Sequence, residues 1–202
     1  MKTLPPDIQS LSRRDLLVKT GKLSIASMAM LMGVSTKAFA AKNISAASSY
    51  SDSSQDIDIL NEILGTEYEG IGAYQVFVDG SLFQKDVLKM ALLFQGHHKQ
   101  HSDILVSTIK SLGGDPVIAK TDEQYASDLD TTIIKTQSDA LQLMLTLELG
   151  AANAYINMLP STRDRELAKL AGRIAADEVM HWIMLSKTLK EALPADALSF
   201  GA

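Results

Sequence analysis

Apolar positions recur with helical spacing along most of this 202-residue chain, with polar positions between them. Apolar residues return every three or four positions in four stretches, at about 56–78, 82–112, 138–160 and 163–193. That period is typical of amphipathic helices, which bury one face. No stretch alternates apolar and polar residues as a half-buried strand does. The pattern therefore predicts an all-α protein built from four long helices.

The segments between these stretches differ in length. Asp-Gly-Ser at 79–81 is a short break, and Ser161 follows a proline where the fourth helix is expected to be capped. The segment 113–137 holds about 25 residues, is polar and predicts no convincing helix, and Ser138 is expected to cap the third helix. Short loops join antiparallel neighbours in a bundle and a long connection joins parallel helices. We predict a four-helix bundle with one long crossover between the second and third helices.

The N-terminal segment 1–40 has the layout of an export signal. Residues 12–19 contain paired arginines, residues 23–34 are moderately apolar, and residues 38–40 read Ala-Phe-Ala. The apolar run is too short to span a bilayer comfortably, and small-x-small is a signal-peptidase pattern. The paired arginines resemble a twin-arginine signal. We expect cleavage near Ala40, a periplasmic location and no stable membrane anchor.

The rest of the chain is expected to divide into a flexible leader at 41–55, a bundle at 56–193 and a short tail at 194–202. The intact chain carries a net charge of −5. Removing the export signal would remove six basic and two acidic residues, leaving 13 basic, 22 acidic and a net charge of −9. So acidic a protein is not expected to bind nucleic acid or anionic membranes.

Cysteine is absent from the sequence. Its absence excludes disulfides, thiolate metal sites and a cysteine nucleophile. Metal chemistry that does not use thiolates stays open.

Each predicted apolar stripe is interrupted near its middle by residue types that bind metals. An unpaired charge on a buried stripe costs several kcal/mol, so such residues need a partner or an ion. Two of these residues at a spacing of i, i+3 share one helix face and can reach one ion. The interrupting residues are Glu67 in the first stretch, His98 and His101 in the second, Glu148 in the third, and Glu178 and His181 in the fourth.

The two halves of the chain repeat each other. Each single glutamate is followed seven residues later by a tyrosine, Tyr74 or Tyr155. Glu67 is followed 34 residues later by His101, and Glu148 is followed 33 residues later by His181. This regularity indicates a duplicated helical hairpin. The tyrosines are expected to be core aromatics, with contact to the metal ligands as the alternative.

Other polar residues and the lone tryptophan lie near the ligand positions. Glu62 and Glu69 fall off the stripe and are expected to face solvent. His97 points about 100° away from His98 around the helix, so it is expected to be exposed or to support a ligand. Trp182 is expected to make a packing or dimer contact, and a homodimer stays open.

One glutamate from each of two helices, with Glu-x-x-His from the other two, is the di-metal pattern of ferritin-like proteins. The chain resembles the bacterial ferritin-like domain family over about residues 56–192, and members of that family often carry a twin-arginine signal. The resemblance implies one or two metal ions in the bundle core, iron first. It also implies a small oxidant such as oxygen or peroxide, with ferroxidase, peroxidase or catalase-like activity.

One position departs from that pattern, because His98 stands where the first Glu-x-x-His would have its glutamate. Three carboxylates and three histidines remain, and the added nitrogen favours copper or zinc more than the usual set does, with manganese also open. Two alternatives remain open: a metal-binding protein without turnover, and a metal-free structural bundle that binds a partner.

Overall fold

The computed structural model describes residues 48–162 and 164–201. Within these ranges every regular element is helical and none is a strand, which confirms the all-α prediction. The predicted export signal at 1–40 lies outside the described residues. Among the described helices, none combines the length and apolar character needed to cross a membrane.

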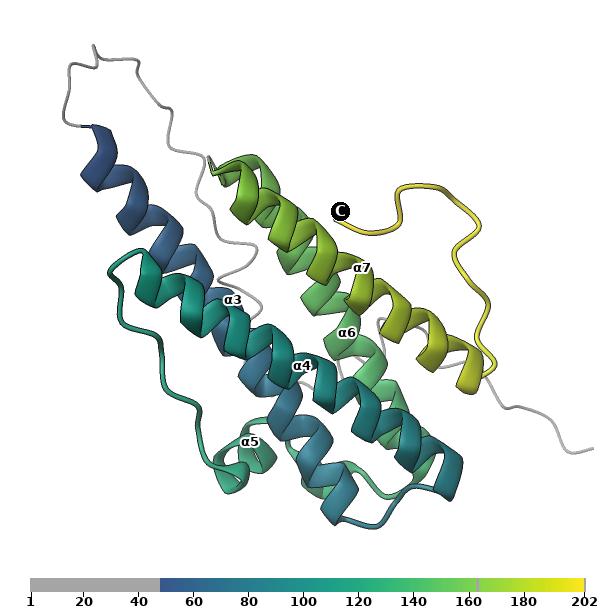
Figure 1. Cartoon of the computed structure of the whole chain (residues 1–202). Helices are drawn as coiled ribbons and strands as arrows, with labels where there is room; N and C mark the ends of the chain where they lie inside the picture. Colours follow the sequence, from purple (N-terminus) through teal and green to yellow (C-terminus); the bar gives the residue numbers. More distant parts are fainter. Residues whose placement is uncertain (1–47, 163, 202) are drawn as a thin grey trace, which may run out of the picture.

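Four long helices form the bundle in Figure 1. They are α3 (Ser48–Asp79), α4 (Lys85–Ser111), α6 (Gln137–Met158) and α7 (Arg165–Thr188). Helix α3 packs along α4 and α6 along α7, so each short loop joins an antiparallel pair. Helix α3 also packs on α6, and α4 makes fewer contacts with α7. The crossover returns along the bundle, so that α4 and α6 run in the same direction.

The crossover contains helical structure that the sequence did not predict. Helix α5 (Asp122–Asp128) and a short 3₁₀ turn (Thr131–Ile133) lie within it. Thr121 begins α5 with a capping box, in which its side chain accepts from the Gln124 backbone N–H. Helix α5 packs on α3, where the Tyr125 ring lies so close that a Cβ on Gly72 would be 2.3 Å from it. Seven residues are too few to show clear periodicity, so the prediction of an unstructured crossover was wrong here.

The helix boundaries differ from the predicted ones by a few residues. Thr136 rather than Ser138 caps α6, because its side chain accepts from the Asp139 backbone N–H. Asp164 rather than Ser161 caps α7, and α7 ends at Thr188 instead of near 193. In both cases the residue that caps the helix lies within three positions of the predicted cap, and both residue types are good caps.

Helix α3 begins at Ser48, inside the segment 41–55 that was expected to be a flexible leader. No glycine or proline interrupts residues 48–56, so nothing in the sequence stops the helix from extending towards the N-terminus. The part of the expected leader before Ser48 lies outside the described residues.

The C-terminal tail lies on the bundle. The Phe200 ring packs edge-on against Trp182 with centroids 5.3 Å apart, and the Gly201 backbone N–H donates to Asn153 Oδ1 at 2.7 Å. Trp182 is therefore buried by residues of its own chain, which supports the packing interpretation of this residue.

Two apolar clusters fill the bundle, one towards each end. One includes Tyr74, Phe77, Phe94, Met144 and Leu185. The other includes Leu60, Leu64, Leu105, Ile109 and Ile174. On every long helix the predicted metal-binding residues lie between the residues of the two clusters. The fold therefore places a polar layer in the middle of an otherwise apolar core.

Candidate metal centre

The middle layer holds all six residues that the sequence singled out. Each is almost completely buried, with a relative exposure of 5% or less. They come from all four long helices, which bring together residues more than 100 positions apart in the sequence. The six are Glu67, His98, His101, Glu148, Glu178 and His181.

Glu67, His98, His101 and Glu178 form a first group, whose ligand atoms all lie within 4.8 Å of one another. His98 Nδ1 lies 2.7 Å from Glu67 Oε2, and His101 Nδ1 lies 3.0 Å from Glu178 Oε1. Two carboxylates and two imidazoles at these separations can surround one divalent ion.

His98, Glu148, Glu178 and His181 form a second group under the same limit. His98 Nε2 lies 3.3 Å from Glu148 Oε1. His181 Nδ1 lies 3.2 Å from an oxygen of Glu148 and 3.2 Å from Glu178 Oε2. The donor types match those of the first group.

His98 and Glu178 belong to both groups. Glu178 directs Oε1 to His101 of the first group and Oε2 to His181 of the second. His98 directs Nδ1 to Glu67 and Nε2 to Glu148. The histidine that replaces the expected glutamate therefore keeps a position between the two groups, although only a nitrogen without a proton can bind an ion.

The two tyrosines of the repeat contact the ligands of the opposite half. The Tyr74 hydroxyl donates to Glu148, and the Tyr155 hydroxyl donates to Glu67. Both phenols are buried in the core, so each one packs there and also fixes a carboxylate. Such hydrogen bonds orient a metal ligand and raise its affinity for the ion.

Two buried atoms of the first group have no hydrogen-bond partner among the described residues. These are His101 Nδ1 and Glu178 Oε1, which lie 3.0 Å apart without the geometry of a hydrogen bond. Buried polar atoms in native proteins nearly always have a hydrogen-bond partner, whereas these two atoms have only the attraction of an ion pair. A cation between the two atoms would satisfy both, so the residues present fit a metal ion.

The charges of the cluster compensate one another. Burial alone would raise the pKa of Glu67, but the His101 and His98 side chains beside its carboxylate lower it to about 2. Burial alone would lower the pKa of His101, but the carboxylates of Glu178 and Glu67 raise it to about 10. Burial raises the pKa of Glu178 itself. Without an ion, protons on the histidines neutralise the carboxylates, and a bound ion would have to displace them.

Two further residues cover the cluster on the side between α4 and α7. His97 is half-buried, and its Nδ1 lies 2.8 Å from His181 Nε2, with the two rings stacked. Asp177 Oδ2 lies 3.3 Å from His101 Nε2. His97 therefore supports a candidate ligand, which was one of its two predicted roles. Asp177 was missed, because its contact reaches across to another helix and leaves no signal in the local sequence.

Glu69 differs from the prediction, while Glu62 is exposed as expected. Glu69 is half-buried on α3, and burial raises the pKa of its carboxyl group. It faces the gap between α3 and α6, a position that helical spacing alone does not distinguish from solvent.

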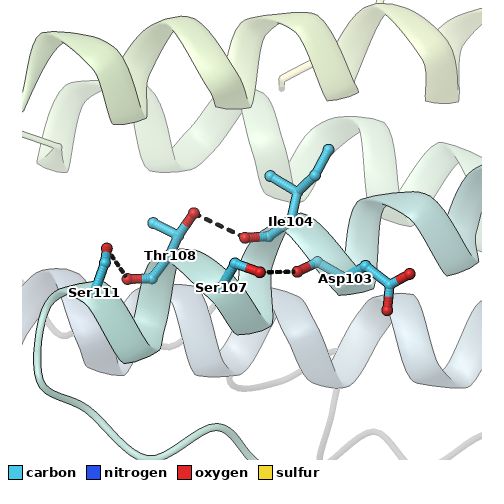
Figure 2. Close-up of a pocket in the computed structure, with 5 residues that line it drawn as sticks. All are labelled: Asp103, Ile104, Ser107, Thr108 and Ser111. Atoms are coloured by element: carbon cyan, nitrogen blue, oxygen red, sulfur yellow. Dashed lines mark hydrogen bonds between the residues drawn. The ribbon is translucent and has the colours of Figure 1, made fainter.

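Figure 2 shows an open hollow on the outer face of α4, apart from the cluster. Three of its hydroxyl groups donate to carbonyls of their own helix: Ser107 to Asp103, Thr108 to Ile104 and Ser111 to Thr108. Hydroxyls used in this way offer little to a ligand. The buried cluster is therefore the better candidate for a functional site.

Comparisons with known proteins agree with the fold. A solved structure of a conserved hypothetical protein from Mycobacterium tuberculosis, rv2844, matches with a TM-score of 0.61 and 18% identity. The match covers 72% of this chain and 97% of that one. No curated protein matches the chain. The ferritin-like domain matches residues 55–191, which include all six candidate ligands. The chain therefore belongs to the ferritin-like domain family.

Proposed function

We propose that this protein binds one or two transition-metal ions in the middle of its helical bundle and serves in redox or oxidative-stress chemistry. The observation that carries the proposal is the pair of buried atoms without hydrogen-bond partners, His101 Nδ1 and Glu178 Oε1. In the metal-free bundle these two atoms are held only as an ion pair, 3.0 Å apart without hydrogen-bond geometry, and that pair requires a proton on His101.

The protein's own residues would hold the ions and control their surroundings. Glu178 has one oxygen for each group, and Tyr74 and Tyr155 fix the two outer carboxylates. The apolar clusters on both sides exclude bulk water, which strengthens the electrostatic interactions within the layer. Iron or manganese bound there would supply one-electron redox chemistry towards oxygen or peroxide.

Iron is the first candidate ion because the family pattern is a di-metal carboxylate site. Three histidines among six ligands are also compatible with copper or zinc, and manganese suits the carboxylates. The proposal covers one ion or two, because the two groups share His98 and Glu178.

Elemental analysis of the purified protein tests the proposal, both as isolated and after reconstitution with each metal. We expect close to one or two equivalents of transition metal per chain. The Glu178→Ala variant is expected to lose the metal, because both groups lose a ligand. The Glu62→Ala variant removes an exposed carboxylate on α3 and is expected to keep its bound metal. A wild-type protein that retains almost no transition metal after reconstitution would refute the proposal.

We also propose export by the twin-arginine route, with the mature protein in the periplasm. The proposal rests on the paired arginines, the apolar run and the cleavage pattern within residues 1–40. A double variant, Arg13→Lys with Arg14→Lys, is expected to remain in the cytoplasm on cell fractionation. Normal export of that variant would contradict this route.

A further inference from the structure

A small cavity lies beside the cluster between α3 and α6, with a volume of about 80 Å³. Its inner wall includes three buried side chains of the candidate centre, Tyr74, His98 and Glu148. Its outer wall includes Thr66 and Glu69, which are half-exposed. The space exceeds the roughly 10–15 Å³ that one water needs on the same measure, so several waters or a partly hydrated ion fit. The cavity therefore extends from the buried ligands towards the surface.

Small residues keep this cavity open. Gly70 lies against His98, where a Cβ would come within 3.2–3.3 Å of three ring atoms. Gly150 faces open space, because a Cβ built on it would meet no atom within 4 Å. Gly150 also stands 81 residues after Glu69, which is the offset between Glu67 and Glu148 in the two halves of the repeat. The two equivalent positions of the duplicated hairpin thus lie on opposite walls, one with a carboxylate and the other with no side chain.

Glu69 is the one charged residue of the cavity lining that does not belong to the six candidate ligands. Its carboxylate makes no hydrogen bond or ion pair with any residue in the described part of the chain. Lys120 is near enough to act on Glu69 electrostatically, but its ammonium is paired with Asp128 at 2.7 Å. A carboxylate without a partner at a narrow opening attracts cations and raises their local concentration.

The opposite side of the cluster, between α4 and α7, is covered by side chains. The outward nitrogen of His181 is engaged by His97, and the outward nitrogen of His101 lies beside Asp177. An ion arriving from that side would have to displace these contacts, whereas the cavity beside α6 reaches Glu148 directly.

We propose that the cavity between α3 and α6 is the path by which divalent cations reach the buried cluster, with Glu69 as a transient ligand at its mouth. The inference rests on the proposed metal-binding function. It adds a route and a residue whose effect falls on the rate of loading and not on the final occupancy.

Stopped-flow loading of the metal-free full chain with Co²⁺, followed by its visible absorption, tests the path. The Gly150→Leu variant places a side chain in the open space, and a helix tolerates leucine better than glycine. We expect its loading to slow by about tenfold or more with the final cobalt content unchanged. Gly172→Leu is the matched control, because Gly172 is an exposed α7 glycine that also has no atom within 4 Å of a built Cβ. The control is expected to load at the wild-type rate.

The Glu69→Gln variant tests the role of the charge. We expect loading to slow by about tenfold at low salt, at the lower end of electrostatic steering effects, and to depend less on ionic strength. Glu62→Gln removes an exposed charge from the same helix and is expected to change neither the loading rate nor its dependence on ionic strength.

Wild-type loading rates in both Gly150→Leu and Glu69→Gln would overturn the path, and so would a lower final cobalt content in either variant. Thermal unfolding confirms that each variant is folded before loading. Absence of cobalt uptake by the wild-type chain would instead refute the proposed function, and the path with it, so the two failures are distinguishable.

Discussion

Replacing Tyr155 with phenylalanine removes one hydroxyl and leaves the rest of the buried ring in place. The hydroxyl donates to Glu67, whose carboxylate is 1% exposed and carries a pKa of about 2, so it is ionised at neutral pH. A hydrogen bond to a charged group contributes about 1.5–3 kcal/mol to stability. For a domain of this size that loss corresponds to a fall in Tm of about 3–12 °C.

Metal affinity should fall in the same variant, because the phenol also orients Glu67 for the ion. Removing a group that orients a ligand typically costs about 10–100-fold in metal affinity. Thermal unfolding of the metal-free protein and competitive Co²⁺ titration measure the two effects separately. Tyr68→Phe is the matched control on α3, since the Tyr68 hydroxyl makes no hydrogen bond to any other residue that the structure describes.

A double-mutant cycle distinguishes the specific contact from general packing. If the Tyr155 hydroxyl acts on Glu67, its removal should have little further effect in a Glu67→Leu background, where the acceptor is gone. An unchanged Tm in Tyr155→Phe, or additive losses in the double variant, would refute the assigned role.

Two other predictions follow from the surroundings of the cluster. Gly70→Ala would place a Cβ 3.2–3.3 Å from the His98 ring, so we expect a net loss of about 1 kcal/mol in the free energy of unfolding, measured with urea. Gly65→Ala meets no atom within 4 Å and should gain about 0.5–1 kcal/mol, so equal effects of the two changes would contradict the close contact with His98. The raised pKa of His101, about 10 against an ordinary 6.5, means that its stabilisation of the metal-free protein is complete below about pH 6.5 and is lost as the pH rises to about 10. The urea concentration at the midpoint of unfolding should be lower above this pH window than below it in the wild type. The difference should be smaller in His101→Gln.

The helical pattern predicted the fold because each long helix keeps one apolar face. The polar interruptions were equally informative, since Glu148 could be placed on a stripe from Leu141, Leu145 and Tyr155 alone. Burial of that glutamate at 1% exposure confirms the reasoning. Helix ends were less predictable, because several residues near each end can cap it, as Thr136 does for α6.

Contacts between side chains on different helices could not be predicted from the sequence. The repeat places each tyrosine seven residues after a single glutamate, but this spacing does not say which glutamate the tyrosine contacts. In the structure each phenol reaches the glutamate of the other helix, because α3 and α6 pack against each other. Glu69 is a second example, since only the packing of α6 on α3 decides whether it faces solvent or a cavity.

The exchange of a carboxylate for His98 makes the two groups unequal even though their donor types match. Glu178 can offer one oxygen to each group at the same time, because both oxygens of an ionised carboxylate accept. A neutral imidazole has one nitrogen without a proton, so His98 can serve either Glu67's group or Glu148's group in a given tautomer, and not both. Whichever group binds through His98 has four ligands, and the other is left with three. A calorimetric metal titration should therefore show one tight and one weaker step, and two equal steps would contradict this assignment of His98.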